Sequence, residues 1–378
     1  MANYHCYRLR VTALTPLHIG SGRDLLNGYD YAIHNGRTWR INEDALLDAQ
    51  DVDDLALAER LAQTPPAQLL QSPDDYRADA PFFRYVIKGT PRSKARGAQV
   101  REQLKDVYDR PYLPGTSLKG ALRTALAWVL WSKKQLRPDS TNLNRRRQFA
   151  ARWYEQELFS QHGGKAPNHD LLRALQVTDS APLSPDQLML VNVRVLNRGG
   201  GLGSPIESEA VRPDAVFELT LKIDEALFSD WAKEGGLRLR GAGLLRNLPK
   251  VVQAYTGQRL EHEAAWYGEI PGAERLAGFY KQFSALSLPP KACLLQLGWG
   301  TGWEGKTFGT HLQADSRFME GILRSPREGG YGLARGKRRS GDPFPKSRRV
   351  LVKVQRSQDG RTLEMPVSPL GWVLVEFQ

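Results

Sequence analysis

The chain has 378 residues, 41% hydrophobic and 25% charged, a composition that excludes collagen, a coiled-coil rod and wholesale disorder. Lys and Arg outnumber Asp and Glu by 53 to 41, giving a net charge of +12. This excess points to a polyanionic partner, with RNA or DNA first. No apolar run approaches a membrane span of roughly 20 residues. Cys6 and Cys293 are far apart and lack a CxxC partner. We therefore expect a cytoplasmic protein with no structural zinc, no other cofactor and no membrane partner.

The charge is segregated along the chain. Residues 43–59 carry seven acids and no base, a net charge of −7, whereas residues 84–123 have a net charge of +7. Residues 335–356 have a net charge of +8, and Arg145, Arg146 and Arg147 form a further basic run. The pattern favours one face for a polyanion and another for a protein neighbour, although any single run also fits a solvated surface.

The N-terminal third predicts strands, helices and one long loop. Residues 4–14 alternate, with Tyr7, Leu9, Val11 and Ala13 on one face, and predict a strand that enters a glycine turn at 15–22. Asn35-Gly36 predicts a type I′ hairpin. Residues 43–76 are helical in composition, with a break at Pro65-Pro66. Residues 84–110 are basic, lack a clear period and are interpreted as a mobile loop.

The clearest helix is predicted at 116–132, after Pro114-Gly115, with Thr116 or Ser117 as N-cap. Apolar residues follow helical spacing from Leu118 to Leu130, and Lys119 and Arg123 share a second face. Gly120 is a poor helix former, which suggests that another backbone approaches it closely.

The remaining pattern predicts strands at 188–196, 215–223, 292–298, 350–355 and 371–377, and helices at 226–233, 242–256 and 273–286. The order of main elements (β, helix, β, β, helix, β) predicts an α+β fold with a ferredoxin-like or RRM-type core and helical and loop insertions. We divide the chain into an N-terminal RRM-like region, 1–240, with a helical insertion at 43–108, and a C-terminal region, 241–378, which completes the core.

Three glycine-containing segments each join a turn to a regular element: LTPLHIGSG at 14–22, YLPGTSLKGALRTAL at 112–126 and LGWGTGWEGKTFGTHL at 297–312. Such turns and helix starts can hold a phosphate with backbone N–H groups, and Lys119, Arg123 and Lys306 would add full charges. Taken singly, each segment is as well explained as an ordinary turn. None contains a Walker or dinucleotide-binding pattern.

Together the segments resemble the RAMP superfamily of CRISPR proteins. The resemblance rests on Leu17-His18-Ile19-Gly20-Ser21-Gly22 and on the longer match from Pro114 to Arg123, PGTSLKGALR. Weaker segments spread over the chain, among them LQVTDS at 175–180 and the ending PVSPLGWVLVEF, resemble the fifth subunit of type III-A Csm effector complexes.

This resemblance implies a modified RRM fold and a non-catalytic, RNA-binding subunit of an antiviral effector. Such a subunit caps the backbone filament at the 3′ end of the CRISPR RNA and supports guide maturation. The implied partners are CRISPR RNA, target RNA, the backbone RAMP subunits, the small helical subunit and host nucleases. The residues expected to bind RNA are His18, Gly20, Ser21, Ser117, Lys119, Arg123, Gly300, Thr301, Gly302, Lys306, Arg335, Lys337 and Arg338.

Two alternatives remain open at this point. The chain could be a RAMP endoribonuclease that processes CRISPR repeats, or a neighbouring RAMP subunit of another type III complex. His18 lies inside the LHIG turn, and a turn-organising or RNA-contacting role is favoured over catalysis. Asp30 is a weak catalytic candidate by analogy with the target-cleaving backbone subunits, and a turn-capping role is favoured. Aromatic residues among the basic loops suit single-stranded RNA or anchor those loops to the core: Phe82, Phe83, Tyr85, Tyr108, Tyr331 and Phe344.

Overall fold

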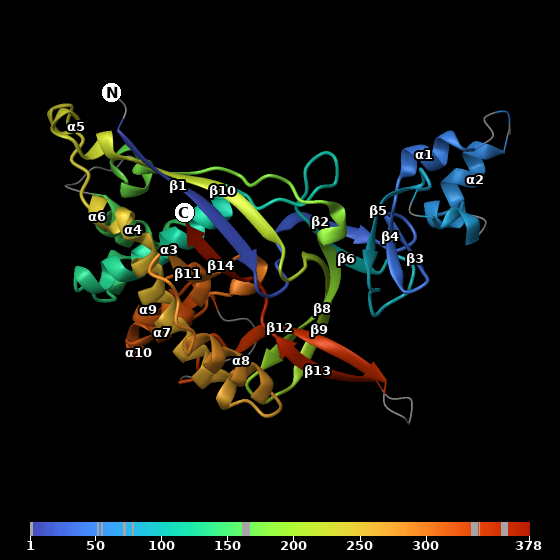
Figure 1. Ribbon diagram of the computed structural model, residues 1–378. Helices are drawn as coiled ribbons and strands as arrows, with labels where there is room; N and C mark the ends of the chain where they lie inside the picture. The colour runs from blue at the N-terminus through green and yellow to red at the C-terminus, as the bar shows by residue number, and fades with distance from the viewer. Residues whose placement is uncertain are drawn as a thin grey trace.

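The computed structural model describes residues 3–50, 53, 56–70, 73–77, 79–160, 167–333, 339, 341–356 and 362–378. Three residues expected to bind RNA, Arg335, Lys337 and Arg338, lie outside this part of the chain, as do Asp51 and Asp54 of the acidic segment. The elements are arranged around two sheets (Figure 1).

The first sheet is the RRM-type core. Its five strands are ordered β11 (Ala292–Gln296), β14 (Trp372–Phe377), β1 (Tyr4–Ala13), β10 (Val216–Asp224) and β7 (Leu175–Val177), and every neighbouring pair is antiparallel. Leu9 and Val11 of β1 pair in register with Leu219 and Phe217 of β10, and all four side chains are buried. The alternation predicted for residues 4–14 is therefore confirmed.

Two long helices supply the other half of this core, α3 (Gly115–Lys133) and α7 (Leu248–Gly268). They pack against each other, and their apolar residues join the sheet in one buried cluster. The order β1, α3, β7, β10, α7, β14, with sheet order β14-β1-β10-β7, is the ferredoxin-like arrangement, and β11 adds an outer strand. The predicted fold class is confirmed.

The second sheet contains most of what the sequence pattern missed. Its main path runs β2 (Gly20–Leu26), β6 (Gln99–Gln103), β9 (Leu202–Val211), β8 (Leu188–Asn197), β5 (Phe83–Lys88), β4 (Arg37–Ile41) and β3 (Tyr31–His34). Strand β12 (Ser347–Arg356) pairs with β8 and with β13 (Thr362–Ser368), and this last hairpin projects from the body (Figure 1).

The hairpin predicted at Asn35-Gly36 is confirmed, since both residues have positive φ, 46° and 71°, between β3 and β4. The interpretation of 84–110 as a mobile loop is wrong: it contains β5 and β6, and both are paired in the second sheet. The sequences of β6 and β9, QVREQ and LGSPIESEAV, carry little apolar alternation of their own. Pairing with neighbouring strands therefore stabilises them as strands.

The smaller helices complete the layers. Helices α1 (Glu43–Asp48) and α2 (Leu57–Gln63) lie beside β3–β5 at one end of the molecule (Figure 1). The others are α4 (Arg152–Phe159), α5 (Asp230–Glu234), α6 (Ala242–Arg246), α8 (Glu274–Ser284), α9 (Gly309–Gln313) and α10 (Ser316–Leu323). Among the described residues, no helix combines the length and apolar character that crossing a membrane requires.

Candidate nucleic-acid interface

A cleft of about 780 Å³ lies where the three glycine-containing segments meet. The loop that enters β2 forms one wall, the first turns of α3 a second, and residues 296–306 a third; β6 adds Arg101 and Glu102. Six of the residues expected to bind RNA line it: His18, Gly20, Ser117, Arg123, Thr301 and Lys306. Segments far apart in the chain, from His18 to Lys306, therefore line one cleft.

Other expected residues lie outside this cleft. The ammonium of Lys119 donates to the carbonyl oxygen of Leu175 at 2.6 Å and does not line the cleft, whereas Arg123 does. Ser21 donates to Glu102 at 2.8 Å. Gly300 and Gly302 line a smaller cavity of about 150 Å³ on another side of the same loop.

The start of α3 is fixed by a close approach of backbone. The helix begins at Gly115, one residue before the predicted start, and its N-cap is Pro114 rather than Thr116 or Ser117. A Cβ on Gly115 would lie 2.4 Å from the carbonyl oxygen of Val177, and its N–H donates to Asp179 at 2.8 Å. Gly120, where a close approach was expected, has open space instead. The helix thus presents Thr116 and Ser117 to the cleft while its first amide is bound within the protein.

The glycine-rich loop rests directly on the loop that contains His18. Gly298 has φ 74°, and a Cβ there would lie 2.2 Å from the carbonyl oxygen of His18. The N–H of Trp299 donates to that same oxygen at 2.9 Å. Only glycine fits this contact, because a side chain would strain the backbone and collide with a neighbouring backbone atom.

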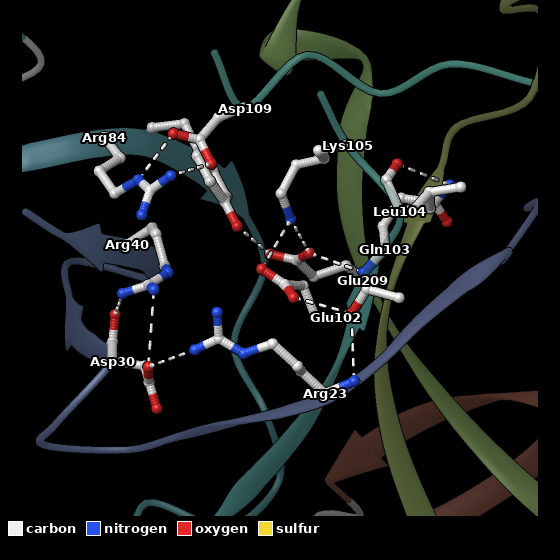
Figure 2. A network of polar contacts seen from close by, with 12 residues as sticks. Arg23, Asp30, Arg40, Arg84, Glu102, Gln103, Leu104, Lys105, Asp109 and Glu209 are labelled. Atoms are coloured by element: carbon white, nitrogen blue, oxygen red, sulfur yellow. Dashed lines mark hydrogen bonds and ion pairs between the residues drawn. The ribbon is translucent and has the colours of Figure 1, made fainter. Parts of the chain in front are cut away.

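A buried carboxylate on the second sheet, that of Glu209, stabilises the loop that contains His18 and Ile19 (Figure 2). Glu209 on β9 is almost fully buried and accepts hydrogen bonds from the Tyr85 hydroxyl, the Gln103 N–H and the Lys105 ammonium at 2.7, 2.9 and 2.6 Å. The Gln103 side chain accepts in turn from the N–H of Ile19 at 3.0 Å. The position of the cleft wall therefore depends on this ion pair.

His18 itself is a buried, neutral side chain. It is 3% exposed, and its Nδ1 lies 2.6 Å from the carbonyl oxygen of Glu209. Burial lowers the pKa of His18 to about 4, against the opposing effect of that hydrogen bond. These contacts match the turn-organising role that the sequence favoured.

The glycine-rich loop carries a feature that the sequence reasoning missed. Two guanidinium groups contact the Trp299 ring, with Arg101 at 4.6 Å and Arg349 at 4.4 Å from the ring centroid. Trp299 and Arg101 both line the cleft. The signal was present, because Arg101 and Arg349 belong to the two basic runs and Trp299 to the GWGTGW motif, but only the fold places them together.

Glu304, the acidic residue within the glycine-rich loop, has a structural role. Although burial works to raise the pKa of the Glu304 carboxyl, the hydrogen bond from His262 and the charge of Arg348 hold it well below its usual range. Arg348 also donates to Glu263 at 2.9 Å. This buried network fixes the loop from behind while Lys306 lines the cleft.

Asp30 lies in the turn before β3, where its carboxylate accepts from the Leu26 N–H at 2.8 Å and faces Arg40 at 3.5 Å (Figure 2). It does not line the cleft. Among the aromatic residues singled out, Phe83 and Tyr85 are buried in the core, and Tyr108 is 72% exposed.

The comparisons agree with this architecture. The family model of the RAMP superfamily matches residues 10–303, so the chain belongs to the RAMP superfamily. Two relatives are named "CRISPR system Cms protein Csm5". The relative from Mycobacterium tuberculosis (strain CDC 1551 / Oshkosh) is 26% identical over 230 residues, 58% of this chain and 55% of that protein. The relative from Streptococcus thermophilus is 26% identical over 252 residues, 59% of this chain and 66% of that protein.

Two solved structures share the fold. One is a chain of the "Cryo-EM structure of Csm-crRNA-target RNA ternary complex in type III-A CRISPR-Cas system", with TM-score 0.72 and 22% identity over 98% of this chain and 100% of that one. The other is the "Crystal structure of T.onnurineus Csm5", with TM-score 0.64 and 20% identity over 96% and 99%. The resemblance to the fifth Csm subunit is confirmed, and the aligned segment spans about half the length of the mycobacterial relative.

Proposed function

We propose that this chain is a non-catalytic, RNA-binding subunit of a type III-A CRISPR effector, which binds the CRISPR RNA toward its 3′ end and caps the backbone filament. The observation that carries the proposal is the convergence of three separate glycine-containing segments on one cleft lined by Arg23, Arg101, Arg123 and Lys306. Cationic side chains beside glycine turns suit the phosphates of single-stranded RNA. The family membership and the named relatives support the same assignment.

The contacts of His18 and Asp30, the two residues considered for catalysis, support a non-catalytic role. His18 is buried with one ring nitrogen engaged, and Asp30 is bound within a turn outside the cleft. A repeat-processing endoribonuclease of this superfamily would cut labelled repeat RNA in EDTA. We expect intact RNA in that assay, and specific cleavage would favour the enzyme instead.

The binding test compares two cations on one helix. Arg123 lines the cleft and is 34% exposed at its side chain, whereas Lys119, one turn earlier, donates to Leu175 outside it. We expect Arg123→Ala and Lys306→Ala each to weaken binding of single-stranded RNA, and Lys119→Ala to leave it unchanged. Affinity should fall with salt by about 0.7 log units per neutralised phosphate per log unit of salt. Equal affinities for all variants, or a flat salt response, would refute the cleft as the RNA site.

The position in the complex needs a second experiment. Guide RNAs that carry a single photoreactive uridine near either end would be assembled with the backbone subunits and the small helical subunit. We expect cross-links to this chain from the 3′ end alone. Cross-links from the 5′ end would assign the chain to another place in the filament and favour a neighbouring RAMP subunit.

A further inference from the structure

The cleft does not end at Arg123 and Lys306. These two residues and Thr124 also line a second pocket of about 270 Å³, which lies between α3, α4, the segment after the glycine-rich loop, α9 and α10. Unlike the cleft, its walls are mainly apolar and aromatic, with contributions from Tyr154, Trp303, Phe308, Phe318 and Tyr331.

The aromatic walls of this pocket are held rigidly. The Phe308 and Tyr154 rings both stack on Trp131, at centroid distances of 5.0 and 5.1 Å. The Trp303 ring packs edge-on against Phe344 at 5.0 Å, and the Tyr331 hydroxyl donates to the Asn144 carbonyl at 2.6 Å. Tyr154 and Phe318 close the floor, since they are 2% and 7% exposed, while Trp303, Phe308 and Tyr331 are half-buried. The pocket is therefore preformed rather than induced.

On its far side the pocket continues into a third cavity, of about 680 Å³, with which it shares Leu143, Phe318, Ile322 and Tyr331. Three arginines line that outer cavity: Arg145, Arg317 and Arg324. Among the described residues, none of the three forms an ion pair. Three acids line the same cavity, Asp139, Asp315 and Glu328, and they cap the backbone N–H groups of Thr141, Phe318 and Ser325. The order along the surface is thus a cationic cleft, an aromatic pocket and a cavity whose three arginines stand beside acids already used as backbone caps.

We propose that the aromatic pocket holds a single unstacked nucleobase of the RNA whose backbone runs from the cleft into the outer cavity; this inference rests on the function proposed above. Single-stranded RNA is recognised by stacking splayed bases on aromatic side chains while cations bind the flanking phosphates. A volume just below the roughly 300–1,000 Å³ of drug-sized sites suits one base rather than a longer segment. Continuity with the cleft favours RNA over an apolar side chain of a neighbouring subunit.

The test uses a set of RNAs in which one base at a time is removed from an otherwise unchanged strand. With the wild-type protein, we expect one position at which loss of the base weakens binding by about 5- to 150-fold, the range that stacking of one base supplies. Loss of the base at the other positions should change affinity far less.

A pocket-filling variant makes the test specific. Ala151 is half-buried and lines the pocket, so Ala151→Trp should weaken binding of intact RNA by that same factor and abolish the effect of removing the sensitive base. Ala285→Trp, at an exposed position after α8, is the matched control and should behave like wild type. Tyr331→Leu removes one ring but keeps apolar bulk, so removal of the sensitive base should weaken binding less in this variant. It replaces Ala151→Trp as the test if that variant does not fold.

The outcomes separate this inference from the function on which it rests. If every base-deleted RNA binds like the intact strand while Arg123→Ala still weakens binding, the RNA uses the cleft and the base pocket is wrong. If Ala151→Trp leaves RNA binding unchanged but releases a neighbouring subunit from the complex, the pocket holds a protein side chain. If Arg123→Ala and Lys306→Ala have no effect on RNA, the proposed function fails and this inference fails with it.

Discussion

The buried ion pair behind the cleft wall gives the sharpest stability prediction. The Lys105 ammonium lies 2.6 Å from the Glu209 carboxylate and 3.7 Å from that of Glu102, and its side chain is 4% exposed. Lys105→Met would leave two carboxylates side by side without their cation (Figure 2). Adding Glu209→Gln removes one of the two charges and keeps an oxygen for the Gln103 N–H, while the amide NH2 takes the place of the other oxygen and can donate to the Tyr85 hydroxyl oxygen.

The expected magnitude follows from the distances. At an effective dielectric constant of about 20, unit charges 2.6 Å apart attract by roughly 6 kcal/mol. Desolvation of the ammonium offsets part of this attraction, and breaking one side of a buried pair costs about 3–5 kcal/mol. We therefore expect Lys105→Met to lose about 3–5 kcal/mol of unfolding free energy. The double variant should recover most of that loss, because it leaves no unpaired charge at Glu209.

Urea unfolding of the four proteins (wild type, both single variants and the double variant) measures the coupling directly. The m-values must agree, so that changes in midpoint report stability alone. Losses that simply add, with no recovery in the double variant, would refute the reasoning. Such a result would mean that the two side chains do not interact as a desolvated pair.

Three further predictions use the same kind of measurement. Gly298→Ala should lower the melting temperature more than Gly302→Ala, because both positions have positive φ but only Gly298 faces a backbone oxygen at 2.2 Å; equal losses would argue against that contact. Leu122→Ala, at a fully buried position of α3, should cost about 2–5 kcal/mol, and a loss well below this in urea unfolding would contradict its packing. Because burial lowers the pKa of His18 from 6.5 to about 4, its contribution to stability is present above pH 6.5 and is lost as the pH falls toward 4. That loss is about 3 kcal/mol at 1.36 kcal/mol per unit, and His18→Asn should remove this part of the pH dependence; an unchanged pH profile in the variant would contradict it.

The core of the fold could be predicted because its elements carry their own periodicity. Strand β1 alternates, α3 follows helical spacing, and Asn35-Gly36 requires positive φ, so local chemistry decides each of them. Strands β5 and β6 were missed because the basic residues between 84 and 110 hide their alternation. Their pairing with β4, β8 and β9 compensates for weak local preference, and this pairing cannot be seen from a single segment.

The sequence indicated which motifs belong to the site, but not how their side chains are arranged. The three motifs do meet, yet motif membership does not say which way a side chain points, and Lys119 faces Leu175 rather than the cleft. The cation–π contact of Trp299 with Arg101 and Arg349 joins three distant parts of the sequence. The aromatic pocket likewise needs α3, α4, α9 and α10 to be placed first.

The contacts under the glycine-rich loop tie the cleft to both ends of the chain. The N–H of Gly371 donates to the Pro16 carbonyl, and the N–H of Leu297 donates to the Gly371 carbonyl at 2.7 Å. Strand β1 can pair only after β10 and β14, its two neighbours in the sheet, have been synthesised. During translation, therefore, the N-terminal strand leaves the ribosome with two open edges, and such edges invite mispairing until the sheet closes. A nascent chain that lacks residues 371–377 also lacks the Gly371 contacts that hold this wall of the cleft.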